Sequence, residues 1–158
     1  MSETRVGIGF DVHPRDDSRT LRLGGVAFGD EPGLAGHSDG DVVCHALADA
    51  FLGAAALGDL GDHFPDTDPE IAGIAGPDLL KLAVRVLEEA GFQPDSCDVV
   101  LLAERPRIAD RRDEIRGGLA SALGLEPPRV SVKATRPEGL GLSGDGAACF
   151  AVATVRRG

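Results

Sequence analysis

Two histidines and one aspartate are the side chains of this sequence best suited to hold a metal ion. Residues 6–13 alternate between apolar and other side chains, which predicts a β-strand with one buried face, so that Asp11 and His13 point the same way. His45 lies on a predicted helix over residues 41–57. Two imidazoles and one carboxylate form a three-ligand zinc set that leaves a fourth position for water or a substrate oxygen. The alternative is an ordinary strand-end His13 and a polar His45 on a helix face.

The segment Gly36-His37-Ser38-Asp39-Gly40-Asp41 comes directly before that helix. Helix N-terminal amides and the Ser38 hydroxyl would form a phosphate-binding cradle, and His37 would orient or neutralise the phosphate. The alternative is a common capped turn, with Ser38 or Asp39 as the N-cap.

Charge is distributed unevenly along the 158 residues. The chain has 16 basic and 26 acidic residues, a net charge of −10, which argues against a nucleic-acid partner. Residues 23–80 contain eleven acids, three of the four histidines and no Lys or Arg. Acids and histidines folded together without basic partners indicate that a cation takes part.

Other motifs have weaker functional interpretations. Glu138 would hold a hard cation or be a surface residue, and the basic stretch 105–107 is interpreted as surface or as a phosphate contact. Residues 139–144 match G-x-G-x-x-G, but they precede a predicted strand instead of a helix, so a dinucleotide fold is rejected. Cys44 has no evident base and is given no catalytic role.

The order of predicted elements indicates an α+β fold. Strands are expected at residues 6–13, 21–26, 97–103, 130–134 and 147–155, and helices at 41–57, 78–90 and 111–123. Polar residues 14–18 are expected to turn, and residues 59–68 to form a mobile loop that closes over a ligand. We therefore predict a two-layer α/β sandwich, a mixed sheet of about four main strands with helices on one face.

Length and composition predict one domain that is neither disordered nor secreted. Hydrophobic residues make up 42% and charged residues 27%. We find no signal peptide pattern and no membrane-spanning apolar run, so a cytoplasmic protein without a membrane partner is expected. Cys44, Cys97 and Cys149 share no C-x-x-C spacing and are interpreted as small core residues.

Four segments of the chain resemble one enzyme family. They are GFDVHP at residues 9–14, LGG at 23–25, the long block GLAGHSDGDVVCHALADAFLGAAALGDLGDHFPDTDP at 33–69, and KATRPEGLGLSGDGAA at 133–148. These motifs are similar to those of the 2-C-methyl-D-erythritol 2,4-cyclodiphosphate synthases of non-mevalonate isoprenoid biosynthesis. The resemblance covers nearly the whole chain and implies a single synthase domain over residues 1–158.

The resemblance implies a homotrimer with active sites between adjacent subunits. The reaction would convert 4-diphosphocytidyl-2-C-methyl-D-erythritol 2-phosphate, a cytidine diphosphate substrate, into the cyclic diphosphate with release of CMP. Asp11, His13 and His45 would be zinc ligands, and Glu138 would hold Mg²⁺ or Mn²⁺. The substrate's own 2-phosphate would attack the β-phosphate, so the protein need supply no nucleophile.

The same resemblance implies the other site residues. His37 and Arg136 would be catalytic. Substrate-binding positions would be Asp11, Val12, His13, His37, Ser38, Asp59, Leu60, Gly61, Phe64, Pro65, Asp66, Thr67, Asp68, Ala103, Glu104, Arg105, Pro106, Arg107, Ile108, Ala109, Thr135, Arg136, Pro137, Glu138, Leu142 and Asp145.

Three positions depart from the family pattern. Arg136 replaces a threonine associated with the transition state, and it would either stabilise a pentacoordinate phosphorus or face solvent. Asp145 replaces an arginine associated with a central trimer cavity for isoprenoid diphosphates, so weak binding of those compounds is predicted. Arg107 stands where lysine is frequent, which keeps the charge and alters the hydrogen-bond geometry.

Two other functions remain as alternatives. One is a zinc-dependent phosphohydrolase, in which water would attack instead of the substrate's phosphate. The other is an inactive trimeric scaffold. The products separate them. The synthase would release CMP together with a cyclic diphosphate, whereas the hydrolase would release CMP with inorganic phosphate or an uncyclised product, and the scaffold would form neither.

Overall fold

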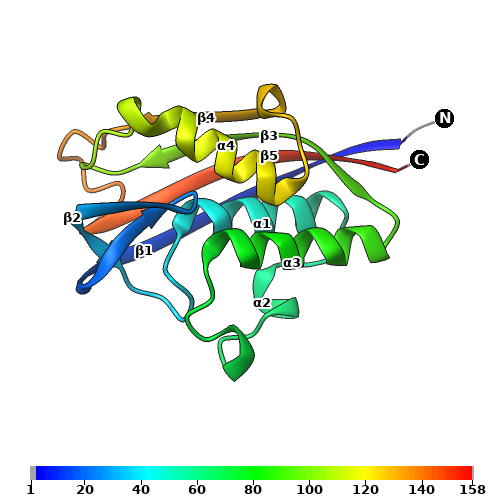
Figure 1. Ribbon diagram of the computed structural model, residues 1–158, viewed down its shortest axis with the longest axis horizontal. Helices are drawn as coiled ribbons and strands as arrows, with labels where there is room; N and C mark the ends of the chain where they lie inside the picture. Colours follow the sequence, from blue (N-terminus) through cyan, green and yellow to red (C-terminus); the bar gives the residue numbers. More distant parts are fainter. Residues whose placement is uncertain (1–2, 158) are drawn as a thin grey trace.

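The computed structural model describes residues 3–157, which form one five-stranded sheet and a layer of helices (Figure 1). The strands are β1 Glu3–Leu23, β2 Val26–Leu34, β3 Gln93–Leu102, β4 Val130–Thr135 and β5 Gly146–Arg157. The helices are α1 Val42–Ala54, α2 Leu60–His63, α3 Gly76–Glu89 and α4 Arg112–Leu123, with short 3₁₀ turns at Pro69–Ile71, Ala109–Arg111 and Pro127–Arg129.

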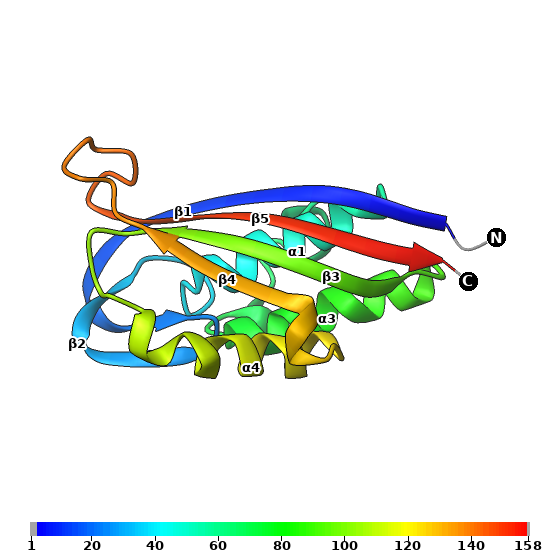
Figure 2. The ribbon, with the colours of Figure 1, turned by 90° about the horizontal axis from the view of Figure 1, so that it is seen from above.

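The strand order in the sheet is β2-β1-β5-β3-β4. β3 and β4 are parallel, and the other neighbouring pairs are antiparallel. Helices α1, α3 and α4 lie on one side of the curved sheet, which leaves the opposite face of β1, β5, β3 and β4 open in Figure 2. The mixed sheet with helices on one face agrees with the sequence prediction, but the sheet has five strands instead of about four.

β1 is longer than predicted, and β2 is the strand that was not predicted. The predicted turn at residues 14–18 is wrong, because β1 continues through them: residues 3–14 pair with β5, and residues 15–23 pair with β2. Irregular pairing between Asp16 and Thr20 accommodates the polar residues without ending the strand. The chain turns instead at Gly24 and Gly25, whose φ angles of 59° and 82° suit glycine. The strand predicted at 21–26 is therefore the end of β1, and β2 follows it.

The packed face of β1 carries glycines. A Cβ at Gly7 or Gly9 would collide with the backbone of α1, so these glycines let the helix approach the strand closely. The apolar side chains of the alternating pattern point the other way, and Ile8 is 80% exposed. The alternation predicts the strand correctly, but its apolar face is the one left uncovered.

α1 is the centre of the core. Leu47, Phe51 and Leu52 are fully buried between the sheet and α3. The predicted helices at 78–90 and 111–123 correspond to α3 and α4, and all three cysteines are buried, as expected. Within residues 3–157, no helix is both long and apolar enough to span a membrane.

Candidate functional site

The three predicted metal ligands converge on one point. His13 Nε2 lies 2.7 Å from Asp11 Oδ2 and 3.1 Å from His45 Nδ1, and His45 Nδ1 lies 3.1 Å from the same Asp11 oxygen. Ligand atoms around a tetrahedral zinc ion lie about 3.3 Å apart. The observed triangle is close to one face of such a tetrahedron, so the three residues fit a small N/O-ligated metal ion.

Strand and helix geometry bring the triad together. Asp11 and His13 are two residues apart on β1, so both side chains project toward α1, on the same face of the strand as Gly9. His45 is in the first turn of α1 and is 8% exposed. The close contact at Gly9 brings the helix bearing His45 down onto the strand bearing its partners.

Ser38 orients His45. The Ser38 Oγ lies 2.7 Å from His45 Nε2, which leaves Nδ1 facing Asp11 and His13. Such a partner on the second ring nitrogen is usual for metal-ligating histidines. Ser38 itself is 6% exposed, so this arrangement is shielded from water.

Asp11 and His45 shift each other's pKa values. Burial raises the pKa of Asp11, but the hydrogen bonds with His13 and His45 outweigh burial and leave it well below its ordinary value. Burial lowers the pKa of His45, but Asp11, Asp41 and Asp39 outweigh burial and raise it overall. The carboxylate is thus kept ionised, as metal binding requires.

The N-terminus of α1 is capped by Asp41, not by Ser38 or Asp39. The Asp41 carboxylate accepts hydrogen bonds from the amides of Val43 and Cys44 and from those of Gly24 and Gly25. These helix amides are therefore occupied, and the prediction that they bind phosphate is wrong. In contrast, Gly36, His37 and Ser38 line the cavity, and within residues 3–157 their amides donate to no protein acceptor.

A cavity of about 530 Å³ opens beside the triad. We call it the acidic pocket; it is lined by Asp11, His13, Ala35, Gly36, His37, Ser38, His45, Asp49, Asp59, Leu60, Gly61, Phe64, Asp66, Ile71, Ile74 and Leu79. Four carboxylates and three imidazoles face it, and no Lys or Arg of the described chain lines it. An anion would be repelled there unless a cation were bound as well.

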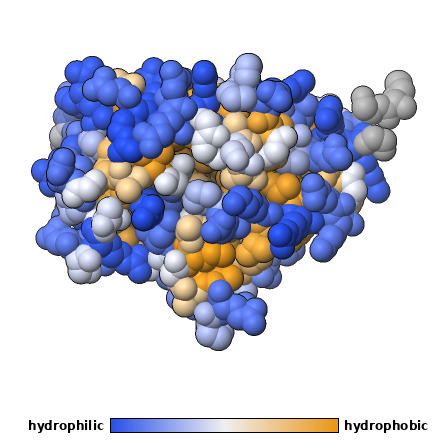
Figure 3. Space-filling view, in the orientation of Figure 1, coloured by the Kyte–Doolittle hydropathy of each residue, from blue (hydrophilic) through white to orange (hydrophobic). Residues whose placement is uncertain are grey.

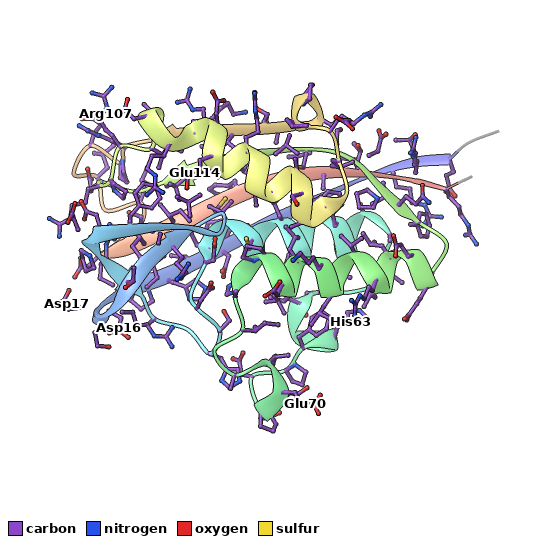
Figure 4. All side chains as sticks on the ribbon, in the orientation of Figure 1. Asp16, Asp17, His63, Glu70, Arg107 and Glu114 are labelled. Carbon is purple, nitrogen blue, oxygen red and sulfur yellow. The ribbon has the colours of Figure 1, made fainter. Side chains whose placement is uncertain are left out.

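Apolar side chains line the lower part of this region. In Figure 3 an apolar surface lies between α2 and the lowest tip of the molecule. The residues that line the cavity include the apolar Phe64, Ile71 and Ile74, and Figure 4 labels His63 near α2 and Glu70 at the tip. The pocket thus combines a charged end at the triad with a less polar wall.

The predicted loop at 59–68 is partly helical. Asp59 accepts a hydrogen bond from the Asp62 amide, and the Asp62 carboxylate accepts one from the Asp59 amide, so a capping box starts α2. The spacing D-x-x-D was the sequence signal for this turn. Asp49 was not predicted as a site residue, although it lies one helical turn after His45; its carboxylate accepts from the Leu60 amide at 2.7 Å, which ties α2 to α1.

A second cavity, of about 200 Å³, lies at the other edge of the sheet. We call it the arginine pocket; it is lined by Ala103, Pro106, Arg107, Ile108, Ala109, Arg112, Ala134, Thr135 and Arg136. Most of these residues were predicted, whereas Arg112, at the start of α4, and Ala134, on β4, were not. Figure 4 labels Arg107 in the loop before α4. Paired residues run from Asp11 through Cys149 and Leu101 to Ala134, three strand spacings or about 14 Å.

Several predicted residues line neither pocket. Val12 is 48% exposed on the open sheet face, and Glu138 is exposed after β4. Glu104 accepts a hydrogen bond from the Gly139 amide, and the Asp68 carbonyl lies 3.2 Å from His37 Nε2. The others that line neither cavity are Pro65, Thr67, Arg105, Pro137, Leu142 and Asp145.

One known protein family matches nearly the whole chain. Residues 4–156 match the YgbB family. The chain is 49% identical over 152 residues to 2-C-methyl-D-erythritol 2,4-cyclodiphosphate synthase of Symbiobacterium thermophilum, covering 95% of this chain and 97% of that protein.

Solved structures share the fold. The bifunctional IspDF of Campylobacter jejuni superposes with a TM-score of 0.93 at 38% identity, covering 100% of this chain and 43% of that one. A structure of 2C-methyl-D-erythritol-2,4-cyclodiphosphate synthase in its CDP-bound form has a TM-score of 0.86 at 35% identity, covering 94% and 98%. This chain therefore spans less than half of the bifunctional protein.

Proposed function

The chain belongs to the YgbB family, and from this premise we infer that it is a cyclodiphosphate synthase, a lyase acting on phosphorus–oxygen bonds. It converts 4-diphosphocytidyl-2-C-methyl-D-erythritol 2-phosphate into 2-C-methyl-D-erythritol 2,4-cyclodiphosphate in isoprenoid precursor biosynthesis. An oxygen of the 2-phosphate forms a bond to the β-phosphorus, and the bond from that phosphorus to the α–β bridging oxygen breaks. CMP leaves with the electron pair, and no water is consumed.

The observation that carries this function is the triad beside the acidic pocket. We assign Asp11, His13 and His45 as zinc ligands, because two imidazoles and one carboxylate suit zinc and their ligand atoms already converge. When bound, zinc would supply Lewis-acid polarisation of phosphate oxygens. Ser38 and Asp11 keep the imidazoles in the orientation that such binding requires.

The backbone at residues 36–38 is assigned to the phosphates. Its amides border the cavity and can donate to phosphate oxygens, and the His37 ring lies beside them with its Nε2 3.2 Å from the Asp68 carbonyl. The 2-phosphate and the β-phosphorus belong to one substrate molecule, so holding them close together and in line favours the intramolecular attack. Asp59, Leu60, Gly61 and residues 64–68 would contact the erythritol and ribose hydroxyls.

The arginine pocket is assigned to the cytidine end of the substrate. Residues 103–109 form one wall and Thr135 another, and Arg107 adds positive charge. Arg136 lines the same pocket and would stabilise the charge that develops on the phosphates as CMP leaves. Glu138 would hold a second cation, Mg²⁺ or Mn²⁺; it is exposed and lies near the arginine pocket in sequence, not near the triad of its own chain.

We further propose a homotrimer with active sites between subunits. The open sheet face carries Val6, Ile8, Phe10, Val12, Phe150 and Val152, which are 45–80% exposed. Phe10 and Phe150 form a cross-strand pair with ring centroids 4.6 Å apart. An exposed apolar patch of this kind favours association. The acidic and arginine pockets lie at different edges of one sheet, so association would let the acidic pocket of one chain meet the arginine pocket of the next.

The domain and its location follow from the same features. We propose that residues 1–158 form one synthase domain, because a single buried core joins the sheet to α1, α3 and α4. A cytoplasmic location is proposed on the three free buried cysteines, which suit a reducing compartment. Burial raises the pKa of Cys97 to about 12, so this thiol is unreactive at neutral pH.

One experiment tests the function directly. Protein purified without chelators is analysed for metal content and then incubated with substrate while phosphorus NMR follows the products. About one zinc per chain, together with a cyclic diphosphate and CMP, is expected. CMP with an uncyclised product would establish the phosphohydrolase instead. Bound zinc without any turnover would favour the inactive scaffold. Sedimentation of wild type beside Ile8→Asp tests the trimer, which the added charge should dissociate.

A further inference from the structure

The loop that forms one wall of the arginine pocket has little regular structure of its own. β3 ends at Leu102, a 3₁₀ turn spans Ala109–Arg111, and α4 begins at Arg112. The backbone at residues 103–108 therefore depends on contacts with other segments to hold its shape. In both Figure 1 and Figure 2 this loop lies at the same end of the molecule as β2 and the loop between β4 and β5.

Arg15 connects these three segments. Its Nη2 donates to the Arg105 carbonyl at 2.7 Å, and its Nη1 donates to the Pro32 carbonyl of β2 at 3.0 Å. The backbone amide of Arg15 donates to the Asp145 carbonyl, in the loop before β5, at 2.8 Å. One guanidinium thus links the pocket loop to the β1–β2 ladder.

A second link to the same loop is more exposed. Arg105 Nε lies 3.0 Å from Glu31 Oε2, but the Arg105 side chain is 64% exposed, so this ion pair contributes little. The Arg15 side chain is partly buried, and it bonds to the backbone of the loop, through a hydrogen bond that is itself exposed, instead of to a mobile side-chain end. Of the two links, the pair of Arg15 hydrogen bonds, which we call the Arg15 clamp, is the stronger restraint on the loop.

We propose that Arg15 is a positioning residue for the arginine pocket and fixes the backbone of residues 103–108 before a cytidine nucleotide binds. The inference rests on the proposed function, which assigns this pocket to cytidine. A loop ordered in advance loses less entropy on binding, so the clamp increases affinity. Arginine is suited to the role because its planar fork reaches two carbonyls on two segments, whereas lysine presents a single ammonium.

The test compares Arg15→Ala and Arg15→Lys with wild type and with Arg85→Ala, an exposed arginine on α3 outside both pockets. Calorimetry measures the Kd for CDP, and kinetics separate KM from kcat. For Arg15→Ala we expect Kd and KM to rise about tenfold while kcat stays within about twofold. Metal content should be unchanged, Arg15→Lys should be intermediate, and Arg85→Ala should match wild type.

The outcomes separate this inference from the function on which it rests. Wild-type CDP affinity in Arg15→Ala would overturn the positioning role. A loss of about tenfold in kcat with no change in KM would also overturn it. Neither result would contradict the proposed synthase activity. A wild-type chain that neither binds CDP nor cyclises substrate would overturn the proposed function and the inference with it. If Arg15→Ala fails to fold, Arg15→Lys decides, since wild-type CDP affinity there rejects the clamp.

Discussion

The acidic pocket and the arginine pocket are built in different ways. The ligands of the acidic pocket stand on a strand and a buried helix that are locked together at glycine contacts. The arginine pocket is lined mostly by loop residues and by exposed arginines, and its main wall is tethered by Arg15. A metal site requires ligand positions fixed to within a few tenths of an ångström, which a packed core provides.

The electrostatics of the two pockets also differ. Four carboxylates face the acidic pocket, whereas Arg107, Arg112 and Arg136 face the other. A substrate with a metal-bound phosphate at one end and phosphate oxygens near a nucleoside at the other would need both. Under the proposed function, the rigid geometry would serve the reacting phosphates and the positive charge would serve the leaving nucleotide.

Removing a ligand from the acidic pocket should have the largest effect. His45→Ala is expected to lose bound metal and to lower kcat/KM about a thousandfold or more, since metal-ion catalysis supplies several kcal/mol. Metal analysis and phosphorus NMR measure both effects. His63→Ala, a histidine outside the triad, should keep its metal. Retained metal in His45→Ala would refute the three-ligand site.

Moving α1 away from β1 should also disrupt the acidic pocket. In Gly9→Ala the new Cβ collides with the carbonyl of Ala46, so we expect unfolding free energy to fall by about 3 kcal/mol and metal affinity to fall with it. Gly29→Ala, in β2 with open space around it, should change stability by less than about 0.5 kcal/mol. Equal melting temperatures for the two variants would show that the glycine contact does not hold the helix in place.

Loosening the orientation of one ligand should have an intermediate effect. Ser38→Ala removes the partner of His45 Nε2, and metal affinity is expected to fall about 10- to 100-fold. Competition with a zinc-binding dye measures the change, with the exposed Ser121→Ala on α4 as control. An unchanged affinity would mean that packing alone orients the ring.

The arginine pocket should be less sensitive to a single substitution. Arg136→Ala is expected to lower kcat about tenfold, less than the loss of a buried transition-state donor, because Arg136 is exposed to water. Single-turnover kinetics measure the change, and Arg85→Ala is the control. An unchanged kcat would show that Arg136 takes no part in the reaction.

Local patterns in the sequence were sufficient for most elements and for the chemistry of the triad. Three local patterns predicted β1, α1 and α3: the alternation over residues 6–13, the alanine-rich stretch after Asp41 and the apolar stripe over 78–90. Such patterns are visible in the sequence because the spacing of apolar residues in a strand or helix repeats within a few residues. The absence of Lys and Arg from residues 23–80 anticipated the acidic pocket.

Only the tertiary structure decided which face of β1 is buried, where β1 ends and which groups cap α1. Gly7 and Gly9 are buried because a helix backbone comes close to them, and no local pattern reports that approach. Asp41, instead of Ser38, caps the helix because the turn at Gly24 and Gly25 adds two more donors to its carboxylate. Arg15 lies in a stretch predicted as a turn, whereas in the fold its guanidinium donates to the carbonyls of Pro32 and Arg105. Contacts between distant segments depend on how the chain packs, so they follow from the fold and not from the order of residues.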